Sequence, residues 1–134
     1  MKKLLLTLIV LLATLCMSAC SISLTGLSEN EITKLVCQEI TPDMTYDEIF
    51  SKLESMGFEL THDMNVVPTQ SLQFPSVVFS YKNVHVRAHL NYTVNKGYEH
   101  EQITSYKSDK IIINGIGSLV VKVSGSRDET VIIP

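Results

Sequence analysis

The sequence predicts an α+β domain in which two N-terminal helices pack on one face of an antiparallel sheet of three to five strands. Three observations support this fold class. Apolar residues recur with helical spacing between residues 28 and 57, and beyond Gly57 the period of the apolar pattern changes from 3.6 to 2. Glycine, proline and asparagine separate these segments. Helices followed by strands, without regular alternation between the two, are typical of a layered α+β fold.

The first nineteen residues have the order of a secretory signal peptide. The chain begins with Met1-Lys2-Lys3, and the residues that follow, 4–15, are apolar except for two threonines. At about 1.5 Å per residue this apolar run spans roughly 18 Å, which is shorter than the ~30 Å hydrocarbon core of a bilayer. We therefore expect residues 1–19 to be a cleaved signal peptide and not a permanent membrane helix.

Cys20 follows the small residues Ser18 and Ala19, which are preceded by Met17. This order resembles the bacterial lipobox, in which an aliphatic residue and two small residues precede the cysteine that receives the lipid. The resemblance implies lipidation of Cys20, and about two acyl chains suffice for stable anchoring. The alternative is an ordinary secretory signal followed by an incidental cysteine. We expect residues 20–27 to form a lipidated tether and residues 28–134 to form a single domain.

Lipidation would make the chain an extracytoplasmic, membrane-anchored lipoprotein. Ser21 supplies no acidic sorting residue after the anchor. In a Gram-negative cell the resemblance therefore implies the periplasmic face of the outer membrane. In a Gram-positive cell it implies the outer face of the cell membrane.

Composition narrows the classes of function further. Cleavage before Cys20 leaves 115 residues, which is enough for one compact domain. These residues include 9 basic and 14 acidic side chains, a net charge of −5, so binding to nucleic acid is not expected. Cys37 is then the single cysteine of the domain, which excludes an internal disulfide. It is either a small buried apolar group or a thiol that pairs with another chain.

Two capping boxes mark the starts of the two predicted helices. Ser28 caps the first helix while Glu31 returns a hydrogen bond, and Thr45 and Glu48 repeat this pattern in the second. Gly57 provides the left-handed end of the second helix. Each box precedes an apolar stripe that would face the core: Ile32, Leu35, Val36 and Ile40 in the first helix, and Tyr46, Ile49, Phe50, Leu53 and Met56 in the second.

Residues 76–94 predict a β-hairpin with its turn at Lys82-Asn83. A two-residue turn would place both apolar rows on one face, as a sheet with a single buried side requires. The predicted cross-strand pairs are Tyr81 with Val84, Phe79 with Val86, and Val77 with Ala88.

Further strand material follows the turn at Asn95-Lys96-Gly97. Residues 99–107 predict a polar third strand. Residues 110–113 and 119–123 predict strands on either side of Asn114-Gly115, and residues 130–133 predict a short edge strand. Residues 71–75 are expected to be a loop or an entry into the sheet.

His85, Arg87 and His89 alternate along one strand, on the face opposite the apolar row. Four residues at about 3.3 Å separate the two histidines by roughly 13 Å, which is too far for one zinc ion with bonds near 2 Å. The arginine between them would also repel a cation. We therefore predict a polar strip that faces solvent or a partner, with no metal and no cofactor.

No group of residues predicts a catalytic site. Cys37 lies on a predicted helix without a histidine nearby in the sequence. Gly115-Ile116-Gly117 and Ser124-Gly125-Ser126 match neither a phosphate-binding loop nor a nucleophile elbow, and we interpret them as turns. The sequence therefore predicts that the protein is not an enzyme.

Residues 40–60, ITPDMTYDEIFSKLESMGFEL, resemble the signature helix of the SmpA/OmlA family of small envelope lipoproteins. That family shows an isoleucine, a short turn, Met-Thr, and an acidic and aliphatic helix that closes at a glycine. The matching positions here are Ile40, Met44, Thr45, Glu48, Ile49, Leu53 and Gly57, whereas Asp43 replaces the usual glycine. The related β-lactamase-inhibitor-like domains share the same helix start. The resemblance implies a scaffold that docks on another envelope protein during outer-membrane assembly.

Three functions compete. The first is a non-catalytic interaction module that binds an envelope protein through the strip of His85, Arg87 and His89 and through the sheet edge. The second is a ligand-binding or inhibitory lipoprotein, which requires exposed aromatic side chains such as Tyr98 and Tyr106. The third is a redox or hydrolytic enzyme that uses Cys37.

Overall fold

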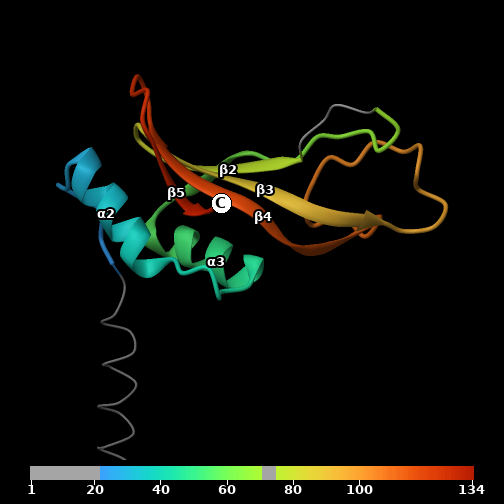
Figure 1. Cartoon of the computed structure of the whole chain (residues 1–134), viewed down its shortest axis with the longest axis horizontal. Helices are drawn as coiled ribbons and strands as arrows, with labels where there is room; N and C mark the ends of the chain where they lie inside the picture. Colours follow the sequence, from blue (N-terminus) through green and yellow to red (C-terminus); the bar gives the residue numbers. More distant parts are fainter. Residues whose placement is uncertain (1–21, 71–74) are drawn as a thin grey trace, which may run out of the picture.

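The computed structural model describes residues 22–70 and 75–134 (Figure 1). Cys20 and the predicted signal peptide lie outside the described residues, as do residues 71–74 of the predicted loop. Two helices, α2 (Glu29–Glu39) and α3 (Tyr46–Met56), precede five strands: β1 (Glu59–His62), β2 (Ser76–Tyr81), β3 (Val84–Val94), β4 (Ile111–Val123) and β5 (Glu129–Ile133). The strands form one antiparallel sheet in chain order. The predicted α+β class is therefore confirmed. Neither described helix is long and apolar enough to cross a membrane.

Both predicted capping boxes are present. The Glu31 carboxylate accepts a hydrogen bond from the Ser28 backbone N–H at 2.7 Å, and the Ser28 hydroxyl accepts one from the Glu31 N–H. These bonds to Ser28 lower the pKa of the Glu31 carboxyl group. Thr45 and Glu48 make the same reciprocal pair at the start of α3. The α3 helix ends at Gly57, whose φ of 104° is the left-handed conformation expected there.

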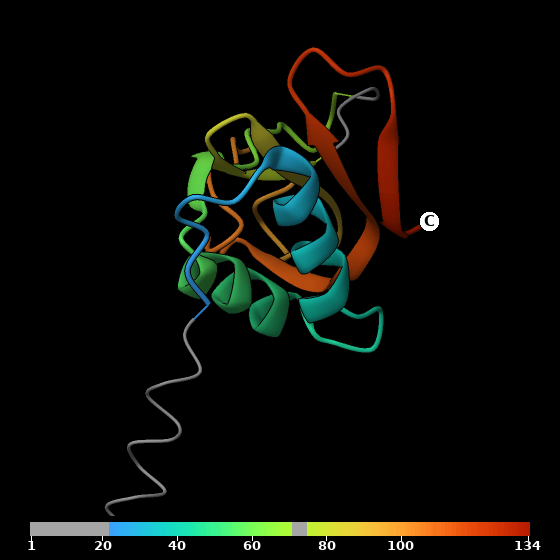
Figure 2. The same ribbon diagram turned by 90° about the vertical axis from the view of Figure 1, so that its left-hand side faces the viewer.

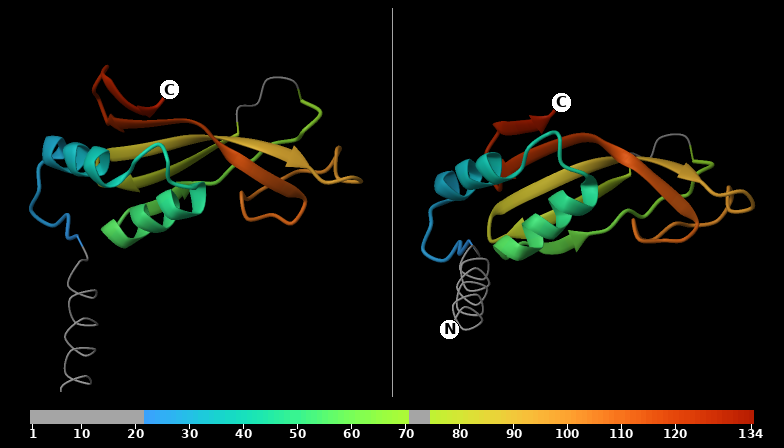
Figure 3. Two further views of the ribbon diagram at one scale, coloured as in Figure 1. Left: turned by 60° about the horizontal axis from the view of Figure 1, so that its bottom comes forward. Right: turned by 90° about the horizontal axis from the view of Figure 1, so that it is seen from below.

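The hydrophobic core contains side chains from both helices and from the sheet. The ring centroids of Phe50 on α3 and Phe79 on β2 are 4.9 Å apart, and Phe79 is fully buried. Seen from below, α3 lies in front of the strands, and α2 lies at the end of the sheet that carries the β4–β5 turn (Figure 3). The sheet contributes a buried row from each of its central strands: Val77 and Phe79; Val84, Val86, Ala88 and Leu90; Leu119 and Val121. We call this side of the sheet the core face and the opposite side the outer face.

The predicted β2–β3 hairpin is confirmed in every pair. Tyr81 lies opposite Val84, and the pairs Phe79–Val86 and Val77–Ala88 follow. Lys82 in the turn has a φ of 50°, the left-handed conformation that a tight hairpin turn uses. The register therefore follows from turn length and alternation alone.

The predicted third strand at residues 99–107 is wrong. This stretch belongs to the loop between β3 and β4, and among the described residues its β-pairing is limited to an isolated bridge between Ile103 and Val66. Its two buried side chains, Ile103 and Tyr106, are three residues apart. That spacing does not fit a strand, in which every second side chain faces the core.

The strand material around Asn114-Gly115 forms one continuous strand, β4, and not two strands with a turn between them. The register with β3 shifts at two places, so that Asn114 and Gly117 have no partner opposite them. Such bulges insert an extra residue without ending the strand. Gly115 has a φ of 155°, which residues with a side chain rarely adopt. Strand β1 was not predicted, because all four of its residues are exposed and show no alternation.

The segment predicted as a tether packs partly against the domain. Leu24 is only 1% exposed, and the half-buried Ile22 and Leu27 also contact the core. A turn brings this segment back onto the fold, because the Leu27 N–H donates to the Leu24 carbonyl and Gly26 has a φ of 79°. Residues 22–27 are therefore not a free polar tether.

Candidate functional site

The outer face of the sheet is ordered into rows by the strand register. One row runs across four strands through Ser80, His85, Lys122 and Glu129. The next row runs through Val78, Arg87, Val120 and Val131, and a third contains Ser76, His89 and Ser118. The alternation predicted for His85, Arg87 and His89 is therefore confirmed, and pairing adds neighbours that lie far away in the sequence.

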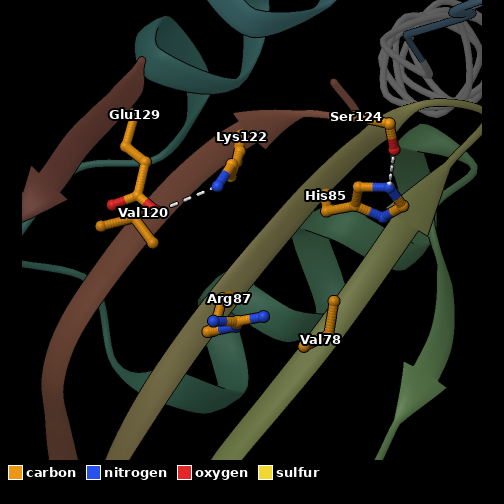
Figure 4. Close-up of a pocket in the computed structure, with 7 residues that line it drawn as sticks. All are labelled: Val78, His85, Arg87, Val120, Lys122, Ser124 and Glu129. Carbon is orange, nitrogen blue, oxygen red and sulfur yellow. Dashed lines mark hydrogen bonds and ion pairs between the residues drawn. The ribbon is translucent and has the colours of Figure 1, made fainter. Parts of the chain in front are cut away.

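A groove of about 360 Å³ lies across the first two rows (Figure 4). Its lining side chains come from the outer-face positions of β2, β3, β4 and β5 and from the turn that follows β4. The turn between β4 and β5, which carries Ser124, rises above α2 at one end of the molecule (Figures 1 and 2). The groove is lined by Val78, His85, Arg87, Val120, Lys122, Ser124 and Glu129.

The ring of His85 is held from both sides. Its Nδ1 atom lies 2.6 Å from the Ser80 hydroxyl and its Nε2 atom lies 2.7 Å from the Ser124 hydroxyl. In a neutral imidazole one nitrogen donates and the other accepts, and a serine hydroxyl can serve as either partner. Each ring nitrogen therefore has a serine hydroxyl as its hydrogen-bond partner, so neither is left available to bind a metal ion in this arrangement. Residues 22–70 and 75–134 contain no group of three or more metal-binding side chains.

A serine hydrogen-bonded to a histidine is also the arrangement that a nucleophilic site needs. In the serine hydrolases a carboxylate orients the imidazole and stabilises the imidazolium that forms. Here the hydroxyl of Ser80 occupies that position, and a hydroxyl carries no compensating charge. The contacts of His85 therefore fix the shape of the groove and do not supply the third member of a catalytic triad.

The two cations of the groove differ in their surroundings. Lys122 has an ion pair with Glu129, with 3.8 Å between Nζ and Oε1 and both side chains about half exposed. Arg87 is exposed and makes no hydrogen bond or ion pair with any residue of the described part of the chain. Its neighbours within the row are the side chains of Val78 and Val120. The groove therefore presents one uncompensated guanidinium between two half-buried aliphatic side chains.

The structure does not bring the two predicted tyrosines into this site. Tyr106 is 6% exposed and packs edge-on against Phe50 with 5.0 Å between the ring centroids, so the expectation that its side chain is exposed is wrong. Burial also raises the pKa of its phenol. Tyr98 is half-buried in the loop between β3 and β4. That loop lies at the end of the molecule opposite to the β4–β5 turn (Figure 1).

Several residues that line the groove, and Ser80, which holds His85, were not among the predicted site residues. Ser80 could have been found from the predicted hairpin, since its register places this serine opposite His85. Lys122, Ser124 and Glu129 carry no such signal, because they reach the groove only through the pairing of β3 with β4 and of β4 with β5.

Cys37 lies half-buried on α2, and burial raises the pKa of its thiol. A raised pKa lowers the fraction of reactive thiolate at any pH below it. We expect iodoacetamide at pH 7.5 to modify Cys37 of the native full-length chain several-fold more slowly than Cys37 of the urea-unfolded chain. Mass spectrometry of samples taken over time measures both rates. A native thiol that reacts at the rate of free cysteine would support the redox hypothesis instead.

Comparison of the chain with protein-family models, with curated proteins and with solved structures finds no match. The resemblance of residues 40–60 to the SmpA/OmlA family therefore stays a prediction from the sequence.

Proposed function

We propose that the protein is a lipid-anchored bacterial envelope lipoprotein that acts as a non-catalytic protein-interaction module. Cys20 would carry the lipid, and the outer face of the sheet would bind the partner. One observation carries this proposal: a groove on that face holds an uncompensated arginine beside aliphatic side chains. Burial of such mixed surface is typical of protein interfaces, in which arginine is enriched.

The proposal includes the arrangement of the two layers. We infer that α2 and α3 both pack on the core face, so that no part of residues 22–70 and 75–134 covers the outer face. Ile32 and Val36 of α2 belong to the same hydrophobic cluster as the sheet. The contact between Phe50 and Phe79 supports the same arrangement for α3.

The proposed location is outside the cytosol. The lipobox at Cys20 supports anchoring to the outer membrane in a Gram-negative cell or to the cell membrane in a Gram-positive cell. The resemblance of residues 40–60 to the SmpA/OmlA family adds a role in envelope assembly. Neither metal nor cofactor is part of the proposal, since we assign the residues that line the groove to binding a partner protein.

The alternative is a ligand-binding or inhibitory lipoprotein of the β-lactamase-inhibitor-like kind, which would use the same groove. The groove volume of about 360 Å³ favours this alternative, because it falls in the range of small-molecule sites. The aromatic side chains that it was expected to use argue against it. Tyr106 lies in the core, and Tyr98 does not line the groove.

Photo-crosslinking in living cells tests the interaction module. Benzoylphenylalanine replaces Val131, which is 55% exposed and lies on the outer face opposite Val120. A matched variant carries the same group at Lys96, an exposed turn residue. We expect irradiation of cells producing the full-length chain to yield protein adducts at position 131 and not at position 96. Recovery of only the uncrosslinked chain from both variants would contradict the proposal.

A further inference from the structure

The row through Val78, Arg87 and Val120 defines the chemistry that the outer face would bind. Adjacent strands are about 4.7–4.9 Å apart, so the two valines lie about 10 Å from each other with the arginine between them. The register puts all three side chains on one face. Val131 extends the aliphatic part of the row by one more strand.

Arg87 has a planar group that matches a carboxylate, because a guanidinium donates two parallel hydrogen bonds to its two oxygens. The other charged groups of the groove do not satisfy it. Glu129 lies in the neighbouring row and faces Lys122, at 3.8 Å between the charged atoms. The arginine is therefore the one cation lining this groove without a carboxylate of its own in the described structure.

The two valines affect the strength of an ion pair between Arg87 and a carboxylate, because they determine how far water is excluded from it. An ion pair that stays in water contributes little, because water screens it. Apolar side chains of a partner that cover Val78 and Val120 would exclude water around the guanidinium. Binding energy concentrates at centres of this kind, which surrounding contacts seal from solvent.

From these observations we infer that Arg87 binds a carboxylate on an extended segment of a partner protein, with apolar residues on both sides of that carboxylate. This inference rests on the proposed interaction function and names the chemistry of its partner. An anionic membrane surface is the less favoured occupant, because such surfaces attract clusters of several basic residues. The groove has one uncompensated cation, and the chain after cleavage has a net charge of −5.

The crosslinking assay with benzoylphenylalanine at position 131 tests this inference in the full-length, membrane-bound chain. Arg87→Gln removes the charge from an exposed side chain that has no bond within the described residues, so the fold should be retained. We expect it to lower the adduct yield by at least about ten-fold. Arg87→Lys should give an intermediate yield, since lysine keeps the charge and loses the planar fork. The matched control Lys96→Gln removes an exposed charge elsewhere and should leave the yield unchanged.

Two further measurements separate binding from a structural effect. In isolated envelope vesicles, raising NaCl from 0.1 to 0.5 M should lower the adduct yield of the parent chain, because salt screens the ion pair. Mass spectrometry of the adduct should locate an aspartate, a glutamate or a chain end beside apolar residues in the partner. Changing that acidic residue to lysine should restore the adduct with Arg87→Glu.

The outcomes distinguish the two proposals. An adduct whose yield is the same in Arg87→Gln would overturn the carboxylate inference and leave the interaction module standing. An adduct with phospholipid in place of protein would overturn the inference in favour of a membrane surface. The absence of any adduct from the parent chain would overturn both.

Discussion

Replacing Phe79 by alanine is expected to lower the free energy of unfolding by about 3–5 kcal/mol. Phe79 is fully buried at the centre of β2, and its ring lies against Phe50 of α3. The substitution removes the contacts of the ring and leaves a cavity that the surrounding strands and helix fill only in part. A domain of this size has a total stability of about 5–15 kcal/mol, so the variant would lose a large fraction of it.

Urea unfolding of the chain beginning at residue 21, followed by circular dichroism, measures this change. The matched control is Ile112→Thr, which keeps a β-branched residue at a strand position that is 57% exposed. We expect the control to change stability by less than about 0.5 kcal/mol. Equal midpoints for Phe79→Ala and the parent chain would mean that the proposed packing of α3 on the core face is wrong.

Replacing Cys20 by serine is expected to abolish incorporation of fatty acid into the protein. The reason is chemical, because a serine hydroxyl cannot form the thioether through which a lipoprotein carries its diacylglycerol. Cells grown with an alkyne analogue of palmitate and producing the parent chain should yield a labelled band after coupling to a dye. The acyl label is the measurement of choice, since an uncleaved apolar leader could itself hold the serine variant in the membrane.

Two controls accompany the Cys20 experiment. Cys16→Ser and Cys37→Ser each remove another cysteine of the chain and should leave the label in place. Label that persists in Cys20→Ser and disappears in Cys16→Ser would move the anchor to the other leader cysteine. A parent protein secreted freely and without label would exclude the lipoprotein assignment altogether.

Predictions from short stretches of sequence succeeded where the determining interactions are local. The bond from Ser28 to Glu31 and the pair formed by Thr45 and Glu48 join residues three positions apart, so the sequence contains both partners of each bond. The β2–β3 register follows in the same way, since a two-residue turn determines which residues face each other.

Predictions failed where the conformation of a segment depends on contacts with residues that are distant in the sequence. Residues 99–107 were predicted to be a polar strand, but they form a loop that is held by the burial of Ile103 and Tyr106. Leu24 was assigned to a tether, because nothing in residues 21–26 indicates that a turn returns it to the core. Asn114-Gly115 resembles a turn and is instead part of a bulged strand, since pairing with β3 continues on both sides of it.

The sequence by itself determined the class of the fold, the starts of both helices, the hairpin and the face on which Arg87 lies. These features depend on bonds and alternation within a few residues, which a linear pattern contains in full. Only the tertiary structure decided that Ser124 holds the second nitrogen of His85, that Glu129 is paired with Lys122, and that Val120 lies on the other side of Arg87. Those neighbours come from β4, β5 and the turn between them, and only sheet pairing, driven by burial of the core face, brings them to one groove.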